Sequence, residues 1–287
     1  MFEEGEHGIM ASVQPDWFRQ LAQWVREPLR RLLPARIKQM IKRTRIAKII
    51  PSPPPSTDPY EPGLCGAIER LVKPGWVCAD VGANIGIITQ LMARLVGSTG
   101  RVVAFELHPD NVRSLRENVM ASGWSKVVHV EACAVSDGSR DRLWVFPGRW
   151  SSSAEWNIVG HDVEGIATDA QFEVPAVSLD QYFVPGARLD LVKIDVEGAE
   201  AHVLAGMKRL LRETRPVAVI EFHDEVGWSG RNELYTAGYD LYEMNGKKLD
   251  PEKDLRRVYH CLGLPKGVSF PSSEFAETQV DSACQRV

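Results

Sequence analysis

Between residues 76 and 244, short apolar runs alternate with amphipathic helical patterns, and this alternation limits the fold of the chain more than any other feature. The apolar runs, which predict strands, cover 76–81, 101–106, 127–135, 189–195, 215–222 and 239–244. The helical patterns cover about 85–96, 109–122, 198–212 and 230–237. This order predicts an α/β fold, in which helices cover both faces of a mostly parallel sheet. Residues 142–147 and 172–179 predict an additional hairpin arm.

The sequence ADVGANIG at residues 79–86 joins the first predicted strand to its helix. A dinucleotide-binding turn requires glycine where Asn84 stands, and a phosphate-binding loop requires Lys and Ser or Thr after Gly86, which this chain lacks. The main chain of this turn therefore carries few large side chains, but the turn lacks the residues that bind a pyrophosphate. A carboxylate at the end of the strand, Asp80, instead suits a ligand that carries an ammonium or sulfonium group.

A second carboxylate, Glu106, ends the next predicted strand, where it can accept both hydroxyls of a ribose. Asp137 follows the third predicted strand, where it can meet an adenine amino group. S-adenosylmethionine combines a sulfonium, an ammonium, a ribose and an adenine. The predicted cofactor-binding residues are Asp80, Gly82, Asn84, Gly86, Glu106 and Asp137.

Four segments, ADVGANIGIITQLMA, VVAFELHPDNVRSLRENV, LVKIDVEGAEAHVLAGM and VIEFH, together resemble the FkbM-type S-adenosylmethionine-dependent methyltransferases. The resemblance covers about residues 60–244 and does not extend to the first 50 residues or to the C-terminal segment. It implies a class I methyltransferase fold, which is Rossmann-like, with a seven-stranded sheet. It also implies methyl transfer, most often to a hydroxyl of a sugar, a polyketide or a lipid-linked glycan.

Polar residues follow the fourth and fifth predicted strands, which should be neighbours in the sheet. Asp195, Glu221 and His223 are predicted to converge there as catalytic residues. His223 or Asp195 would remove the proton of an acceptor hydroxyl, and Glu221 would position that base or the substrate. The alternative is a divalent metal with Asp195 and Glu221 among its ligands, because carboxylate oxygens and imidazoles bind such ions.

Four further residues are predicted to contact the acceptor: Lys193, Glu197, Trp150 and Ser153. Trp150 and Ser153 belong to the segment 148–171, which is long for a loop and therefore a candidate for a functional role. Two alternatives stay open, since Lys193 can form a salt bridge with the neighbouring acids and the long segment can be a plain exposed connection.

The segments outside the alternation differ from it in composition. Residues 1–50 predict a basic amphipathic helical arm, and residues 51–63 are a proline-rich linker. We expect the methyltransferase domain at 64–262 and a C-terminal tail at 263–287. The arm can pack on the domain, or residues 15–50 can make a peripheral contact with an anionic membrane.

Charge separates the arm from the rest of the chain. Residues 17–50 hold ten Lys or Arg and one Glu, while the whole chain has a formal net charge of −4. The remainder is therefore strongly acidic, which disfavours nucleic acid as a partner and favours a small-molecule or glycan acceptor. The beginning of the chain lacks the pattern of a secretion signal, and the five cysteines are widely spaced. We therefore expect a cytoplasmic protein, at the inner face of the membrane if the arm binds lipid.

Three other functions fit the sequence less well than methyl transfer to a small molecule. A nucleic-acid methyltransferase acting on amino groups carries an Asp/Asn-Pro-Pro-aromatic loop after the fourth strand, where this chain reads DVEG. A non-catalytic scaffold that binds S-adenosylmethionine would not need the carboxylates at the strand ends. An NAD-dependent oxidoreductase ranks last because Asn84 replaces the middle glycine of the dinucleotide turn.

Overall fold

The structure is a computed structural model that describes residues 62–147, 156–159, 172–252 and 260–268. The predicted N-terminal arm, Trp150, Ser153 and most of the predicted tail lie outside these residues. In the part of the chain that is described, no helix combines the length and apolarity that a membrane crossing requires.

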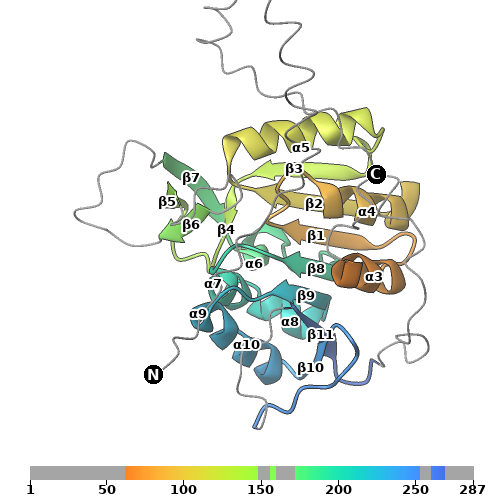
Figure 1. Cartoon of the computed structure of the whole chain (residues 1–287), viewed down its shortest axis with the longest axis vertical. Coiled ribbons are helices and arrows are strands. Elements are labelled where there is room, and N and C mark those ends of the chain that lie inside the picture. The colour runs from red at the N-terminus through yellow and green to blue at the C-terminus, as the bar shows by residue number, and fades with distance from the viewer. Residues whose placement is uncertain (1–61, 148–155, 160–171, 253–259, 269–287) are drawn as a thin grey trace, which may run out of the picture. The chain divides into compact units, whose positions relative to one another are not determined.

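A seven-stranded sheet with strand order β10-β11-β9-β8-β1-β2-β3 forms the centre of the domain (Figure 1). Its strands are β1 (Val77–Val81), β2 (Arg101–Glu106), β3 (Val128–Ala132), β8 (Leu191–Ile194), β9 (Val217–Glu221), β10 (Tyr239–Glu243) and β11 (His260–Pro265). All neighbours are parallel except β11, which is antiparallel to both β9 and β10. This confirms the predicted α/β class and the mostly parallel, seven-stranded sheet of class I methyltransferases.

Alternating side chains of the strands pack on opposite faces of the sheet. One apolar cluster joins alternate strand residues to α3 (Pro62–Leu71), α4 (Ile87–Val96) and α5 (Pro109–Ala121). The other cluster joins the remaining strand residues to α6 (Leu179–Tyr182), α7 (Glu200–Ala205), α8 (Lys208–Glu213), α9 (Glu225–Ser229) and α10 (Arg231–Thr236). Neighbours within one strand show the division, since Cys78 belongs to the first cluster and Ala79 to the second. Helices therefore cover both faces, as predicted.

A second, four-stranded sheet of order β4-β7-β5-β6 lies beyond the carboxyl ends of β2 and β3 (Figure 1). It contains β4 (Ala134–Val135), β5 (Arg142–Pro147), β6 (Trp156–Val159) and β7 (Phe172–Val177). The antiparallel pairing of β5 with β7 confirms the predicted hairpin arm. Leu143, Val145 and Val174 form its small core, against which Leu107 packs. The arm thereby adjoins the end of the sheet where a ligand would bind.

Several boundaries differ from the prediction. The strand expected at 127–135 is divided into β3 and β4 at Cys133, and the helix expected at 198–212 is divided into α7 and α8. Helix α3 begins at Pro62, inside the expected linker, because proline is tolerated in the first turn of a helix. Strand β11 crosses the domain boundary expected at residue 262. The sequence did not predict this strand, because a short apolar run without alternation gives little periodic signal.

Candidate active site

The turn between β1 and α4 is built by residues with left-handed backbone conformation. Gly82 has φ +77° and Asn84 has φ +51°. A β-carbon at residue 82 would overlap the main-chain oxygen of Asp195, so the turn approaches the loop after β8 more closely than any other residue allows. Gly86, the N-cap of α4, has φ +92°, and its β-carbon would meet Leu115 of α5. Gly82 and Asn84 line the pocket described next, whereas Gly86 does not and serves the packing of α4 on α5.

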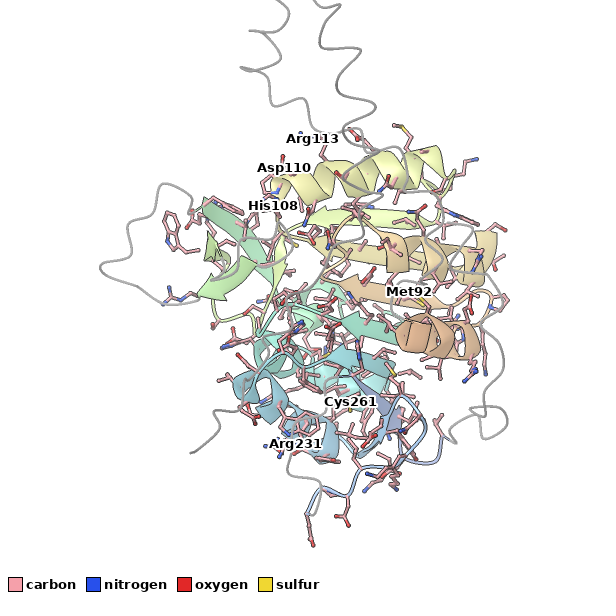
Figure 2. All side chains as sticks on the ribbon, in the orientation of Figure 1. Met92, His108, Asp110, Arg113, Arg231 and Cys261 are labelled. Atoms are coloured by element: carbon pink, nitrogen blue, oxygen red, sulfur yellow. The ribbon has the colours of Figure 1, made fainter. Side chains whose placement is uncertain are left out.

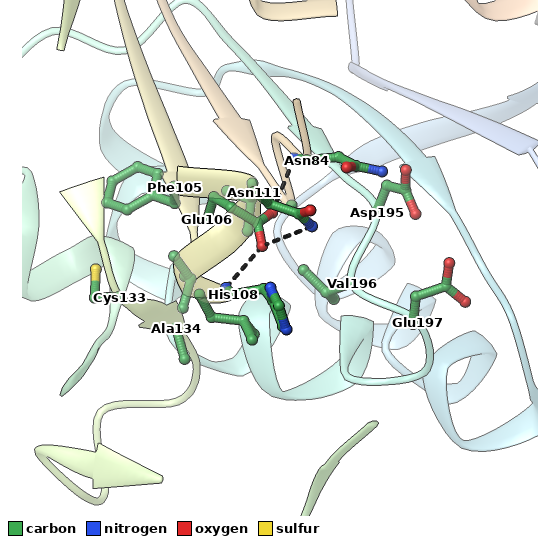
Figure 3. Close-up of a pocket in the computed structure, with 14 residues that line it drawn as sticks. Asn84, Phe105, Glu106, His108, Asn111, Cys133, Ala134, Asp195, Val196 and Glu197 are labelled. Atoms are coloured by element: carbon green, nitrogen blue, oxygen red, sulfur yellow. Dashed lines mark hydrogen bonds between the residues drawn. The ribbon is translucent and has the colours of Figure 1, made fainter. Parts of the chain in front are cut away.

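A pocket opens at the carboxyl ends of β1, β2 and β8 (Figure 3). Its lining residues are Val81, Gly82, Asn84, Phe105, Glu106, Leu107, His108, Asn111, Cys133, Ala134, Val135, Asp195, Val196 and Glu197. Glu106 lies on one side, Asp195 and Glu197 lie on the other, and apolar side chains from β4 and its approach form part of the wall (Figure 3). Burial raises the pKa of the Cys133 thiol to about 12, so this wall stays uncharged at neutral pH.

Glu106 faces this pocket and is held by main-chain donors. Its Oε2 accepts the Asn84 N–H at 2.8 Å, and its Oε1 accepts the His108 N–H at 2.8 Å. The second bond orders the start of α5, where the His108 side chain accepts the N–H of Asp110 (Figure 2). A carboxylate oxygen accepts more than one hydrogen bond, so Glu106 keeps acceptor capacity toward the pocket.

Asp80 occupies a different place from the one predicted for it. Its side chain is fully buried and does not line the pocket. Its Oδ2 accepts the hydroxyl of Thr89 at 2.6 Å, and its Oδ1 lies 3.5 Å from Nζ of Lys193. Asp80 therefore lies beneath the turn, beside the pocket lining, and its contact with a cofactor stays a prediction.

Lys193 joins the glycine turn after β1 to the loop after β8. Its Nζ donates to the carbonyl oxygen of Gly82 and to Oδ2 of Asp195, both at 3.0 Å. The side chain is 5% exposed and does not line the pocket, and its ion pairs are those of the salt-bridge alternative, while contact with an acceptor stays a prediction. Lys193 fixes the glycine turn and the Asp195 carboxylate relative to each other.

His223 lies among four carboxylates behind the pocket. Its Nε2 is 3.3 Å from Oε2 of Glu197, 3.3 Å from Oε1 of Glu221 and 3.7 Å from Oδ1 of Asp195. Its Nδ1 is 2.8 Å from Oε1 of Glu200. The structure thus brings together the three predicted catalytic residues, and Glu197 and Glu200 complete the cluster. Only Asp195 and Glu197 of this cluster line the pocket.

Burial and the neighbouring charges shift the pKa values of His223 and Asp195. Burial lowers the pKa of His223, but the hydrogen bonds to Glu200 and Glu221 and the charge of Glu197 outweigh burial and raise it to about 10. Burial raises the pKa of Asp195, and the charge of Lys193 opposes that rise. At neutral pH these shifts favour the protonated form of His223 and make the pocket-lining Asp195 carboxylate more basic than an exposed aspartate. Of the two bases predicted from the sequence, Asp195 fits this arrangement better than His223, and the assignment stays a prediction.

Glu197 has left-handed backbone conformation with φ +55°, which is uncommon for a residue other than glycine, asparagine or aspartate. The same loop contains Gly198 with φ +106°. Such backbone strain is concentrated at functional sites in proteins. Here it turns the chain so that Glu197 lies within reach of both the pocket and His223.

Ligand atoms of Asp195, Glu197 and His223 all lie within 4.8 Å of one another, which is compatible with a single metal ion. Glu197 rather than Glu221 completes this group, in contrast to the pair predicted from the sequence. A divalent ion bound there would take the place of the proton on Nε2 of His223.

Asp137 lies outside the pocket. Hydrogen bonds from the hydroxyl and the main-chain N–H of Ser139 lower its pKa, and His202 of α7 lies 3.5 Å away. Asp137 follows β4, two residues after the pocket-lining Val135, and its contact with adenine stays a prediction. In this part of the chain, the residues that line the pocket are Cys133, Ala134 and Val135.

Sequence reasoning missed His108, Asn111 and His260. The side-chain amide of Asn111 lies 3.4 Å from Oε1 of Glu106. It could have been found as the residue one turn into the helix that follows Glu106. His260 pairs with Glu221 across β11 and β9, and its Nε2 is 3.3 Å from Oε2 of Glu221. It was missed because no strand was predicted around residue 260.

Residues 80–241 match the family model described as the methyltransferase FkbM domain. The chain is 29% identical over 132 residues to protein-L-isoaspartate O-methyltransferase 1 of Arabidopsis thaliana, an alignment that covers 46% of this chain and 52% of that protein. It is 26% identical over 176 residues to 2-O-methyltransferase NoeI of Sinorhizobium fredii, covering 57% of this chain and 70% of NoeI. It thus spans about half the length of the Arabidopsis protein.

The crystal structure of methyltransferase FkbM from Methylobacillus flagellatus is similar with a TM-score of 0.41 and 14% identity, over 69% of this chain and 50% of that one. The family model covers more than half of the chain, and its range includes the glycine turn, Glu106, Asp195 and His223. The chain belongs to the FkbM methyltransferase domain family.

Proposed function

We propose that this protein is an S-adenosylmethionine-dependent methyltransferase that methylates a hydroxyl of a sugar, a glycolipid or a polyketide-type small molecule. The observation that carries the proposal is one pocket with a held carboxylate, Glu106, on one side and a buried carboxylate of raised pKa, Asp195, on the other. Membership of the FkbM family and the similarity to NoeI, whose name describes a 2-O-methyltransferase, support it.

S-adenosylmethionine supplies a methyl group that its sulfonium activates for transfer. The residues of the pocket fit this molecule, because Gly82 and Asn84 line it and Glu106 offers carboxylate oxygens to ribose hydroxyls. Leu107, Ala134 and Val135 provide an apolar wall for a flat base. In this proposal Gly82, Asn84 and Glu106 remain cofactor-binding residues, and His108 and Asn111 join them.

Asp195 accepts the proton of the acceptor hydroxyl in this proposal. It lines the pocket, and burial raises its pKa toward the range in which a carboxylate is an effective base. Lys193 holds its Oδ2 at 3.0 Å, which leaves Oδ1 on the side of His223. Glu221 and His223 act behind Asp195 by fixing the carboxylates that face the acceptor.

The charge of the pocket favours a neutral acceptor over an anionic one. Asp195 and Glu197 both face the space that an acceptor would enter, and like charges at short range repel. A hydroxyl requires a base and tolerates these groups, whereas a carboxylate acceptor such as an isoaspartate side chain requires no base and would be repelled. The same repulsion disfavours the phosphate backbone of nucleic acid. Trp150 and Ser153 remain proposed acceptor contacts.

A labelled-methyl assay tests this function. Radioactive methyl transfer from S-adenosylmethionine should appear in neutral glycan or lipid fractions of a cell extract and not in protein, RNA or DNA. Asp195→Asn should lower turnover at least ~100-fold with cofactor affinity within ~2-fold, as expected for loss of a general base. Glu106→Gln should instead weaken cofactor binding, and Asp110→Asn, an exposed control, should change neither. Cofactor binding without transfer to any fraction would favour the non-catalytic scaffold.

Removal of metal ions by a chelator tests whether Nε2 of His223 carries a proton or binds a metal ion. If Asp195 acts as an unaided base, exhaustive treatment with EDTA should leave turnover unchanged. Loss of turnover that only Mg²⁺, Mn²⁺ or Zn²⁺ restores would assign the Asp195, Glu197 and His223 group to a metal instead.

We further propose that the basic segment 17–50 holds the enzyme near a membrane-borne acceptor. Its ten cations and single acid contrast with the acidic remainder of the chain. Electrostatic attraction to an anionic leaflet would raise the local concentration of enzyme at a glycolipid or lipid-linked glycan.

A further inference from the structure

We propose that Glu200 is a positioning residue for methyl transfer, because it holds His223 and the turn at Gly198 in the arrangement that presents Asp195 and Glu197 to the pocket. This inference rests on the proposed function. Glu200 begins α7, is fully buried and does not line the pocket. Any effect on the reaction must therefore pass through the residues that it contacts.

One oxygen of Glu200 joins two parts of the site. Its Oε1 accepts the main-chain N–H of Gly198 at 2.9 Å and the Nδ1–H of His223 at 2.8 Å. The first bond fixes the strained turn that carries Glu197, and the second fixes the imidazole ring at the end of β9. The loop after β8 and the residue after β9 are thus tied to the same atom.

The hydrogen bond between Glu200 and Nδ1 of His223 also determines which groups lie near Nε2 of the same ring. With Nδ1 directed at Glu200, Nε2 points toward Glu197, Glu221 and Asp195, at 3.3, 3.3 and 3.7 Å. These four acids, with Lys193 beside Asp195, surround the ring from β8, β9, α7 and the loop between β8 and α7. A ring released from Glu200 would be free to turn, and the carboxylates would lose a common cation at short range.

A carboxylate at this position is costly for folding alone. Burying a charge carries a desolvation penalty, and an apolar side chain of similar size would pack at lower cost. The structure also reserves space for it, since a β-carbon on Gly227 of α9 would overlap Oε2 of Glu200. Gly227→Ala should therefore displace the carboxylate while its charge remains, and Glu200→Gln should remove the charge while an acceptor remains.

These two variants test the proposal with matched controls. Turnover should fall at least ~10-fold in both, because small misplacements of catalytic groups reduce rates strongly. The dissociation constant of S-adenosylmethionine should stay within ~2-fold. Glu213→Gln, an exposed acid of α8, and Gly66→Ala, a glycine in helix α3 with open space around its β-carbon position, should behave as wild type. Wild-type turnover in both test variants, or equal losses of turnover and cofactor affinity, would overturn the proposal.

A second readout does not depend on methyl transfer. Proton NMR of the full chain should show a slowly exchanging imidazole N–H of His223, assigned by its loss in His223→Gln. This signal should disappear in Glu200→Ala and persist in Glu213→Gln. Persistence in Glu200→Ala would refute the contact itself. If the wild-type protein transferred no methyl group but showed this signal, the proposed function would fail while the contact between Glu200 and His223 stood.

Discussion

Gly82 brings the turn after β1 against the main chain of the loop after β8. Gly97, at the end of α4, also has a positive φ, +66° against +77°, but has open space around the position of a β-carbon. Alanine at either site is strained by the positive φ. Only Gly82→Ala also displaces Asp195, so it should weaken S-adenosylmethionine binding at least ~10-fold, whereas Gly97→Ala should leave binding unchanged. Titration calorimetry measures both, and equal affinities would show that the close approach is dispensable.

His223 makes stability depend on pH. Its pKa rises from the ordinary 6.5 to about 10 in the folded chain, so folding favours its protonated form. The resulting stabilisation is complete below about pH 6.5 and is lost as the pH rises toward 10. In EDTA-treated protein, the excess stability of wild type over His223→Gln should therefore be larger at pH 7 than at pH 10, as measured by urea unfolding. A difference that grew with pH would contradict an imidazolium at this position.

At the scale of elements, the alternation of apolar runs and helical patterns predicted the strands that are flanked by helices in the sequence. It did not predict β11. Strand β2 ends in a polar residue, Glu106, that stands out against a buried run, so both the strand and its pocket-facing end were predicted. Strand β11 reads HCLGLP, which contains a glycine, ends in proline and has no alternation. Its place between β9 and β10 depends on long-range pairing that no local pattern encodes. The burial of Asp80 and the environment of His223 could not be predicted for the same reason, because they arise from contacts between distant segments.

Strand β11 should nevertheless be as important for stability as the predicted strands. Leu262 is 1% exposed and packs with the cluster under α3 and α4, whereas Val268 is 47% exposed. Leu262→Ala should lower the free energy of unfolding by about 2–5 kcal/mol, the usual cost of truncating a buried leucine. Val268→Ala, six positions further along the chain, should change it by less than about 0.5 kcal/mol. Urea unfolding of the two variants measures this difference, and similarly small effects would show that β11 contributes little to the stability of the domain.

At the scale of the whole molecule, the proposed membrane contact depends on charge that is concentrated in one part of the chain. Each Lys or Arg near an anionic surface contributes about 1 kcal/mol of attraction, and salt screens it. The full chain should bind phosphatidylglycerol vesicles more tightly than phosphatidylcholine vesicles, less so as salt increases. The combined change K42Q/R43Q/R45Q/K48Q should weaken binding at least ~10-fold. The control R116Q/K126Q/R140Q/K266Q removes four exposed cations of the described domain and should bind as wild type. If both sets weakened binding equally, or if neutral vesicles bound as well as anionic ones, the attraction would not reside in residues 17–50, and the enzyme would have to reach its acceptor without this segment.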